Sequence, residues 1–312
     1  METLILPPAL HEGDRVVILS PSSKIDCHFL QGAAGRLRSW GLEPVMAPHA
    51  EGACGTYAGT VDERLADLQG AMDDPDVRAI LCSRGGYGAV HLLERLDFTR
   101  LARSPKWLIG FSDITALHAA FQRAGFASLH APMARHLTVE PADDEATRAL
   151  HDLLMGTTPG GKAPAIACTP HRLNRRGTAE GTLRGGNLSV FYGLRGTPWD
   201  FPAEGTLLFL EDVGERPHAV ERMLYNLRLG GVLDRLAGII VGQFTEYEEN
   251  LSLGKPLYDA LADVLGGCTC PVCFDFPVGH VTRNLPLICG AHARLEVGPA
   301  EVKLTFDQET KI

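Results

Sequence analysis

The sequence predicts an α/β protein with an N-terminal parallel-sheet domain and a smaller C-terminal domain of mixed α+β structure. Two observations predict it. Apolar strand-like runs alternate with helical patterns through the first half of the 312 residues, which indicates βαβ units and a mostly parallel sheet. A stretch rich in Gly, Pro and Thr at 156–170 then interrupts this pattern. We therefore expect domains at 1–158 and 178–312, joined by a linker at 159–177.

The first half supplies the elements of the parallel sheet. The run RVVILS at 15–20 is continuously apolar, as expected of a strand buried on both faces. Thr60 and Glu63 have the spacing of a capping box, which predicts a helix that ends near Met72. The other elements expected here are helices near 28–39, 113–123 and 143–155, and strands at 43–47, 78–83, 107–110 and 128–131.

The second half has a different texture. TLLFLE at 206–211 and AGIIVG at 237–242 are predicted buried strands, with an amphipathic helix at about 216–228 between them. Near the end, 293–297 and 301–306 flank a Gly-Pro turn and are predicted to form a hairpin.

Composition and charge narrow the class of protein. The net charge is −9 and no run of Lys or Arg occurs, which argues against a nucleic-acid partner. No apolar stretch reaches the roughly 20 residues of a membrane span. The opening METLILPPALHEGD lacks the pattern of a signal peptide. We expect a cytoplasmic protein with no membrane partner.

The cysteines indicate neither disulfides nor a metal site. Eight are scattered through the chain, and we expect reduced thiols. The group Cys268, Cys270 and Cys273 lacks the paired spacing of a zinc knuckle, and Cys273 lies in an apolar run that predicts a buried strand. We expect no metal and no cofactor.

The segment GFSDIT at 110–115 follows a predicted strand and opens a predicted helix. This arrangement resembles a nucleophile elbow, with Ser112 as the nucleophile and the amide of Asp113 as an oxyanion donor. The match to G-x-S-x-G is incomplete, because position 114 is Ile, and a serine at such a junction often serves only as a helix cap.

A serine nucleophile needs a base and an orienting acid. Glu211 ends the apolar run TLLFL, where a carboxylate is unusual without a partner, and the adjacent Asp212 is an alternative acid. Among twelve histidines, His280 follows Pro277 and Gly279 in a loop context that favours it as the base. The order Ser, Glu, His also occurs in α/β-hydrolases, which are a rival class.

The turn SRGGYG at 83–88 lacks the spacing of a dinucleotide or Walker loop. It is better suited to close approach of the backbone to a substrate. The amide of Gly85 or Gly86 is a candidate second oxyanion donor, and Arg84 is a candidate anchor for a substrate carboxylate.

Seven segments in order along the chain resemble the LD-carboxypeptidase family of serine peptidases. They are GDRVVILSPSS at 13–23, SRGGYGAVHLLERLD at 83–97, LIGFSDITALHAAF at 108–121, RGGNLSV at 184–190, FLEDVGERPHAVERMLYNL at 209–227, AGIIVGQF at 237–244 and FPVGHVTRNLPLICGA at 276–291. One departure is HAPMA at 130–134, where the family has HGP.

The resemblance implies a flavodoxin-like or amidotransferase-like N-terminal domain and a C-terminal domain with a smaller β-rich sheet. It places the nucleophile at Ser112, the acid at Glu211 and the base at His280, with the amides of Asp113 and Gly86 as oxyanion donors. It further implies a homodimer that releases D-alanine from a cell-wall peptide by cleaving an L,D-bond.

The family also includes microcin-C immunity peptidases, which cleave an acyl-nucleotide toxin. LEDVGE at 210–215 resembles the muropeptide branch more closely, and no aromatic insertion for stacking on a base is apparent in the sequence. A protein that binds a muropeptide or nucleotide without catalysis is a third interpretation.

Overall fold

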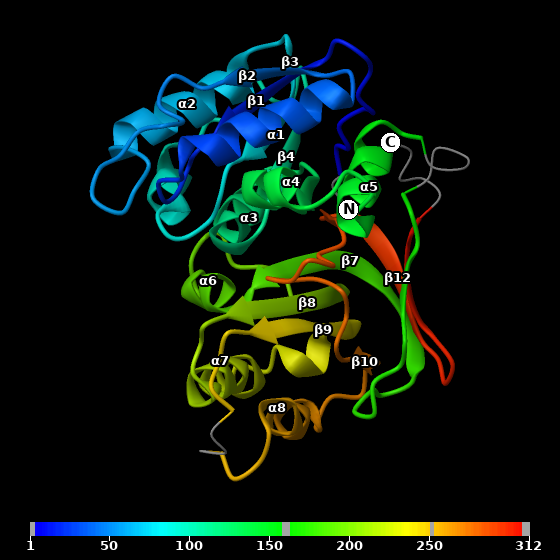
Figure 1. Cartoon of the computed structure of the whole chain (residues 1–312). Coiled ribbons are helices and arrows are strands. Elements are labelled where there is room, and N and C mark those ends of the chain that lie inside the picture. Colours follow the sequence, from blue (N-terminus) through cyan, green and yellow to red (C-terminus); the bar gives the residue numbers. More distant parts are fainter. Residues whose placement is uncertain (1–3, 158–162, 250–252, 308–312) are drawn as a thin grey trace. The chain divides into compact units, whose positions relative to one another are not determined.

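The computed structural model describes residues 4–157, 163–249 and 253–307. The chain divides into two compact units, each of which is described by itself. Unit 1 contains the described residues up to Ala163 together with Thr282–Gly290. Unit 2 contains Pro164–Val281 and the described residues from Ala291 onward. The expected α/β class with two domains is confirmed, and both units have a sheet with helices beside it (Figure 1).

Unit 1 is built on a sheet of six strands among the described residues, in the order β11-β5-β4-β3-β1-β2. All neighbours are parallel except β11, which runs antiparallel to β5. The strands are β1 (Arg15–Leu19), β2 (Glu43–Met46), β3 (Val77–Cys82), β4 (Trp107–Gly110), β5 (Ser128–His130) and β11 (Leu287–Cys289). The parallel strands are those that the alternating apolar runs predict.

The helices of unit 1 connect these strands. The predicted capping box is present, because the Thr60 hydroxyl accepts from Glu63 N and the Glu63 carboxylate accepts from Thr60 N. The helices are α1 (Cys27–Ser39), α2 (Val61–Asp73), η1 (Ala89–Arg95, 3₁₀), η2 (Ser112–Ile114, 3₁₀), α3 (Thr115–Arg123), α4 (Ala134–Val139) and α5 (Glu145–Leu154).

Unit 2 has a mixed sheet of seven strands among the described residues, in the order β10-β9-β8-β7-β12-β13-β6. The four strands from β7 to β10 are parallel, and β12, β13 and β6 are antiparallel to their neighbours. The strands are β6 (Ile166–Cys168), β7 (Gly177–Asn187), β8 (Thr206–Val213), β9 (Gly238–Thr245), β10 (Val272–Cys273), β12 (His292–Val297) and β13 (Val302–Phe306). The predicted terminal hairpin is β12 and β13.

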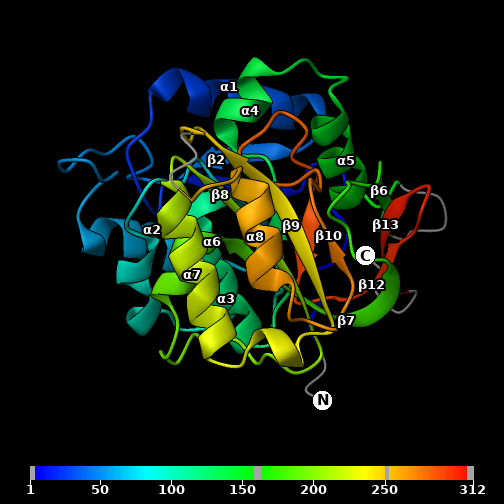
Figure 2. The ribbon, with the colours of Figure 1, turned by 90° about the horizontal axis from the view of Figure 1, so that it is seen from below.

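Two helices cover one face of this sheet. Figure 2 shows α7 (Pro217–Leu229) and α8 (Leu257–Leu265) lying side by side across β8 and β9. The shorter helices of unit 2 are α6 (Leu188–Gly193) and η4 (Leu233–Arg235, 3₁₀). The helix predicted at about 216–228 is α7.

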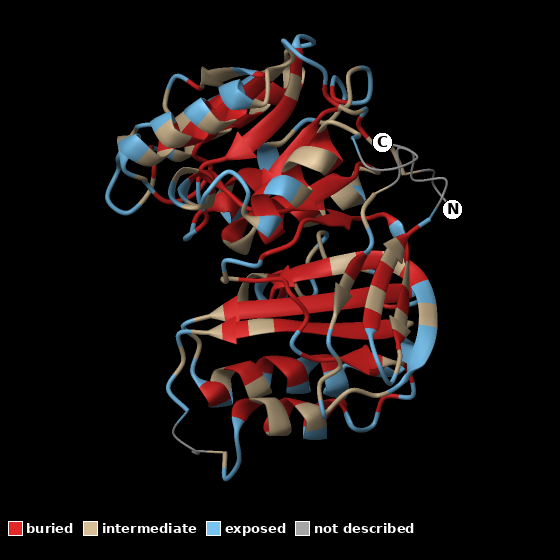
Figure 3. Cartoon of the chain, turned by 45° about the vertical axis from the view of Figure 1, so that its right-hand side comes forward, coloured by how far each residue is buried: buried red, intermediate tan, exposed pale blue. Residues whose placement is uncertain are grey.

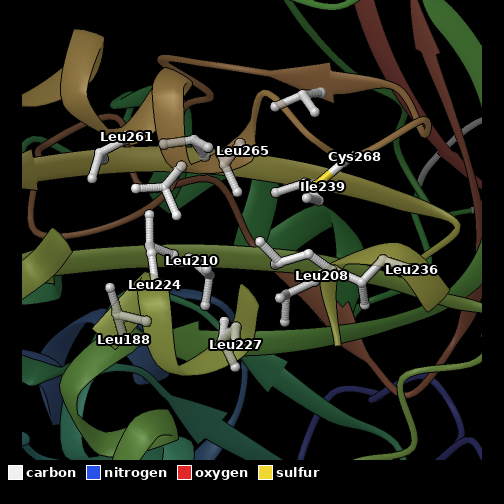
Figure 4. Packing of buried hydrophobic residues seen from close by; sticks show 14 of the residues in the cluster. Leu188, Leu208, Leu210, Leu224, Leu227, Leu236, Ile239, Leu261, Leu265 and Cys268 are labelled. Atoms are coloured by element: carbon white, nitrogen blue, oxygen red, sulfur yellow. The ribbon is translucent and has the colours of Figure 1, made fainter. Parts of the chain in front are cut away.

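The core of unit 2 lies between that helix pair and the sheet. Leu208, Leu210 and Ile239 point from β8 and β9 toward Leu224 and Leu261 of the helices (Figure 4). Figure 3 shows that β8 and β9 are buried along most of their length. The helices α7 and α8 carry buried residues on the face that packs against the sheet. Within the described ranges, no helix has the combination of length and hydrophobicity that a bilayer span requires.

Two elements differ from the predicted organisation of the chain. Strand β6 falls inside the stretch 159–177 that was expected to be a linker, and residues 158–162 lie outside the described residues. Strand β11 comes late in the chain yet pairs with β5, so Thr282–Gly290 belongs to unit 1.

Candidate active site

Ser112 lies at the turn between β4 and α3. Its backbone φ is 65°, in the left-handed region that non-glycine residues rarely adopt. Such a conformation costs roughly 1–3 kcal/mol and persists where the surrounding structure enforces it, often at functional sites. The turn presents Ser112 beyond the carboxyl end of β4, where active sites of open α/β sheets lie. The local structure is therefore the strand–turn–helix that the sequence predicts.

The glycine loop, residues 84–89, contacts Ser112 through Gly85. A Cβ atom added to Gly85 would lie 2.8 Å from Ser112 Cβ, 2.9 Å from Ser112 Oγ and 3.0 Å from Asp113 N. Real Cβ atoms essentially never show contacts shorter than 3.0 Å, so the two contacts with Ser112 cannot form without a shift. Position 85 must therefore be glycine if the serine side chain and the Asp113 amide are to keep their places.

Three backbone amide groups belong to the glycine loop and to the turn at Ser112. The N–H groups of Gly85, Gly86 and Asp113 have no hydrogen-bond acceptor among the described residues. Amides of this kind beside a serine hydroxyl are suited to stabilise an oxyanion. The neighbouring Arg84 is exposed and donates from one guanidinium nitrogen to Lys24 O at 3.0 Å.

Glu211 and His280 lie together in unit 2. His280 Nδ1 is 2.7 Å from Glu211 Oε2, and the side chains are 20% and 0% exposed. Because an ionised carboxylate only accepts hydrogen bonds, Nδ1 is the donor, and in the neutral ring Nε2 is the nitrogen that carries no proton.

Glu211 also changes the basicity of His280. Burial disfavours the imidazolium, but the hydrogen bond and charge of Glu211 oppose burial. With smaller contributions from Asp212 and Glu246, they raise the pKa of His280 above the ordinary value of 6.5. A positioned histidine with this environment is suited to act as a general base whose imidazolium form is stabilised.

A local irregularity of the sheet explains how this pair forms. Leu210 pairs with Val241 but Asp212 pairs with Phe244, so Glu211 alone faces two residues of β9. The segment 276–281 packs on this bulge, where Gln243 N donates to Val278 O at 2.9 Å.

Gly279 allows the closest approach of that segment. Its φ is 131°, and a Cβ atom there would lie 3.0 Å from Glu211 Cβ. The next residue, His280, therefore reaches the Glu211 carboxylate. In the sequence Gly279 was only part of the loop context of His280, because its role depends on a contact with Glu211 that the sequence does not show.

Asp212, the alternative acid, has other partners. Its carboxylate accepts from Asn187 Nδ2 at 2.8 Å and from Ser189 N at 2.9 Å, and so fixes the start of α6. Burial, with the nearby charge of Glu211, raises the pKa of Asp212 to about 6. The acid in contact with His280 is Glu211.

His118, which lies on the helix after Ser112, has a structural position. It is fully buried, and its ring nitrogens lie 2.8 Å from Ser128 Oγ and 2.9 Å from Gly110 O. Burial lowers its pKa to about 4, so it is neutral at physiological pH. In the part of the chain that the structure describes, no group of three or more His, Cys, Asp or Glu side chains is arranged to hold a metal ion.

An aromatic group flanks the glycine loop, although the sequence shows no aromatic insertion. The rings of Tyr57, Tyr87 and His91 lie 5.3–6.3 Å apart, centroid to centroid. Tyr87 is itself a residue of the loop and is 55% exposed. An exposed aromatic ring of this kind offers a face on which a planar group of a ligand can stack.

The predicted site residues thus fall into two sets. Ser112, Asp113, Gly86 and Arg84 belong to unit 1, and Glu211 and His280 belong to unit 2. The structure brings the acid and base into contact, and it brings the nucleophile against the glycine loop.

Comparison with known proteins gives matches along nearly the whole chain. Residues 16–131 match the LD-carboxypeptidase N-terminal domain, and residues 180–295 match the LD-carboxypeptidase C-terminal domain. A putative carboxypeptidase of Streptomyces coelicolor is 38% identical, with 97% of each chain covered. The murein tetrapeptide carboxypeptidase of Pseudomonas aeruginosa is 34% identical, with 90% of this chain and 93% of the relative covered.

Two further matches represent both branches of these proteins. The crystal structure of muramoyltetrapeptide carboxypeptidase from Oxalobacter formigenes has a TM-score of 0.84 and 28% identity, covering 94% of this chain and 99% of that chain. The microcin C7 self-immunity protein of Escherichia coli is 27% identical, with 80% of this chain and 79% of the relative covered.

Proposed function

Because this chain belongs to the LD-carboxypeptidase family and is a serine-type carboxypeptidase, we propose that it releases the terminal D-alanine from murein tetrapeptides during cell-wall peptide recycling. The proposed triad is Ser112 as nucleophile, His280 as base and Glu211 as orienting acid. The observation that carries the proposal is the left-handed conformation of Ser112 at the strand–helix turn. A left-handed conformation raises the free energy of the folded state, and a serine that serves only as a helix cap does not require it.

In the proposed reaction, His280 Nε2 takes the proton of Ser112 Oγ as the oxygen attacks the carbonyl carbon of the L-centre at position three. The developing negative charge on the carbonyl oxygen is stabilised by the amides of Asp113 and Gly86. The C–N bond then breaks, and protonated His280 gives its proton to the amine of D-alanine. Water, activated by the same imidazole, hydrolyses the ester on Ser112 and releases the tripeptide.

Glu211 has two roles in this scheme. Its hydrogen bond of 2.7 Å holds the tautomer in which Nδ1 is protonated, and its charge stabilises the imidazolium that forms after attack. The raised pKa of His280 is the ground-state sign of the second role.

Arg84 is the proposed anchor for the terminal carboxylate of the substrate. Its side chain is exposed beside the glycine loop, and its tether to Lys24 O engages only one of its nitrogens. Guanidinium groups bind carboxylates through two parallel N–H donors, and this selects a substrate with a free C-terminus.

We further propose that the enzyme is cytoplasmic and forms a homodimer. Sedimentation of the purified protein would test the dimer.

The experiment is stereochemical. Two synthetic tetrapeptides, L-Ala-D-Glu-diaminopimelate ending in D-Ala or in L-Ala, are incubated with the enzyme, and the free alanine is measured by chromatography. We expect release from the peptide with the D-terminus alone. Equal release from both peptides would contradict the assignment as an L,D-carboxypeptidase.

A second candidate is hydrolysis of an acyl-nucleotide of the microcin-C type, and the aromatic group beside the glycine loop favours it. The exposed ring of Tyr87 is placed to stack on a planar base. Competition between the tetrapeptide and an aminoacyl sulfamoyl adenosine would decide, because the better substrate has the larger kcat/KM. A chain that binds either molecule without turnover would instead support the non-catalytic interpretation.

A further inference from the structure

The carboxylate of Asp113 is almost completely buried beside the proposed nucleophile. The residue is 2% exposed, and Asp113 Oδ2 accepts from Ser22 Oγ at 2.6 Å and from Ala89 N at 2.8 Å. These three residues come from different segments: the loop after β1, the end of the glycine loop and the turn after β4. A buried charge is costly unless it is hydrogen-bonded, so this oxygen holds the three segments together.

A buried arginine holds two of the same segments. Arg64 is 2% exposed, and its Nη1 donates to Pro21 O at 2.6 Å and to Gly88 O at 2.9 Å. Burial lowers the pKa of Arg64, and the charge of Asp113 opposes that effect. Burial likewise raises the pKa of Asp113, while Ser22, Ala89 and Arg64 oppose it. Each charge therefore favours the ionised state of the other.

Ser23 completes the attachment of the glycine loop. Its amide donates to Gly85 O at 3.3 Å, and its hydroxyl accepts from Tyr87 N at 3.2 Å. With the bond from Ala89 N to Asp113, two loop amides that follow the glycines at 85 and 86 have acceptors inside the protein. The amides of Gly85 and Gly86 have no acceptor among the described residues.

We propose that the Asp113 side chain is a positioning residue that holds the glycine loop, so that the amides of Gly86 and Asp113 act on one oxyanion. The proposal rests on the function proposed above. In this account one residue serves both halves of the oxyanion site. Its amide is one donor, and its carboxylate fixes the loop that supplies the other.

The kinetic test compares three variants on the murein tetrapeptide. Asp113→Ala removes the oxygen that receives both bonds, and we expect kcat to fall by about 10²-fold, the typical effect of losing one oxyanion donor, with KM little changed. Asp113→Asn keeps an oxygen at that place, and we expect it to restore most of the activity. Asp67→Ala is the matched control. Asp67 lies on α2, is 7% exposed and accepts from His49 N at 3.0 Å. Because this bond partner does not belong to the glycine loop, the Asp67→Ala variant should lose stability and retain kcat.

Hydrogen exchange of the peptide covering 84–89 tests, without a substrate, whether the Asp113 carboxylate holds the glycine loop. We expect faster exchange in Asp113→Ala than in wild type, and no such change in Asp113→Asn or Asp67→Ala. Unchanged exchange in Asp113→Ala, or faster exchange with an unchanged kcat, would overturn the inference. A wild-type enzyme that does not cleave the peptide would refute the proposed function instead. It would also refute the proposed effect of the Asp113 carboxylate on catalysis.

Discussion

Gly85→Ala is the substitution for which the structure gives the sharpest expectation. The new methyl group would lie 2.8–3.0 Å from Ser112 Cβ, Ser112 Oγ and Asp113 N. It would occupy the space in front of both the proposed nucleophile and a proposed oxyanion donor. Backbone strain is not the cause, because the φ angle of Gly85 lies outside the left-handed region.

The magnitude follows from what the methyl group displaces. Blocking one oxyanion donor costs about 10²–10³ in kcat, and displacement of Ser112 adds to that loss. Overpacking a tight contact also lowers the free energy of unfolding by about 1–3 kcal/mol. We therefore expect a folded enzyme whose kcat is at most about one hundredth of the wild-type value.

The assay is the steady-state release of D-alanine from the murein tetrapeptide, with circular dichroism to confirm folding. Gly70→Ala is the control, because a Cβ atom at Gly70 meets nothing within 4 Å and the residue lies within helix α2. It should leave kcat unchanged and stabilise the protein by roughly 0.5–1 kcal/mol. A Gly85→Ala enzyme with wild-type kcat would show that the methyl group displaces neither Ser112 nor the Asp113 amide.

Three other substitutions test separate parts of the account. Glu211→Gln should lower kcat by up to about 10⁴-fold. It should also move the acid limb of the profile of kcat/KM against pH from above 6.5 toward lower pH, because the carboxylate raises the pKa of His280; an unmoved limb would contradict the pairing. Gly279→Ala should lower kcat with little effect on KM, since its Cβ would press on Glu211 Cβ at 3.0 Å, and a normal kcat would exclude that contact. Leu208→Ala, at a fully buried position, should reduce the free energy of unfolding in urea by about 2–5 kcal/mol, and a smaller loss would show that the core collapses around it.

The same pKa shift predicts how stability depends on pH. The pKa of His280 is higher in the folded protein than its ordinary value of 6.5. The stabilisation from the ion pair with Glu211 is therefore fully present below pH 6.5, and it is lost as the pH rises through the folded pKa. Urea denaturation of wild type and Glu211→Gln across this range should show the difference in stability shrinking as the pH increases.

Much of the fold could be predicted from local patterns. The apolar runs of the parallel strands in unit 1 and the capping box at Thr60 depend on residues close together in the sequence, and both are present. Strand β7 was not predicted, because its sequence GTAEGTLRGGN is rich in glycine, a residue that is uncommon in strands. Its place in the sheet depends on its pairing with β8 and β12. Strand β11 was not predicted because its pairing partner, β5, lies far away in the sequence.

The candidate site shows the same division. The turn at Ser112 could be predicted from the sequence, because a predicted strand, a glycine and the beginning of a predicted helix follow one another there. The choice between Glu211 and Asp212 was not, because it depends on a bulge between β8 and β9 and on which carboxylate the loop at Gly279 approaches. The role of the Asp113 carboxylate was equally hidden, since its partners Ser22 and Ala89 are distant in the sequence.

We propose that Ser112 is the nucleophile that cleaves the L,D-bond of a murein tetrapeptide. The most direct test is mass spectrometry of L-Ala-D-Glu-diaminopimelate-D-Ala after incubation with wild type and with Ser112→Ala. We expect wild type to remove a single alanine and the folded variant to remove none. Equal cleavage by the two proteins, or no cleavage by a folded wild type, would contradict this proposal.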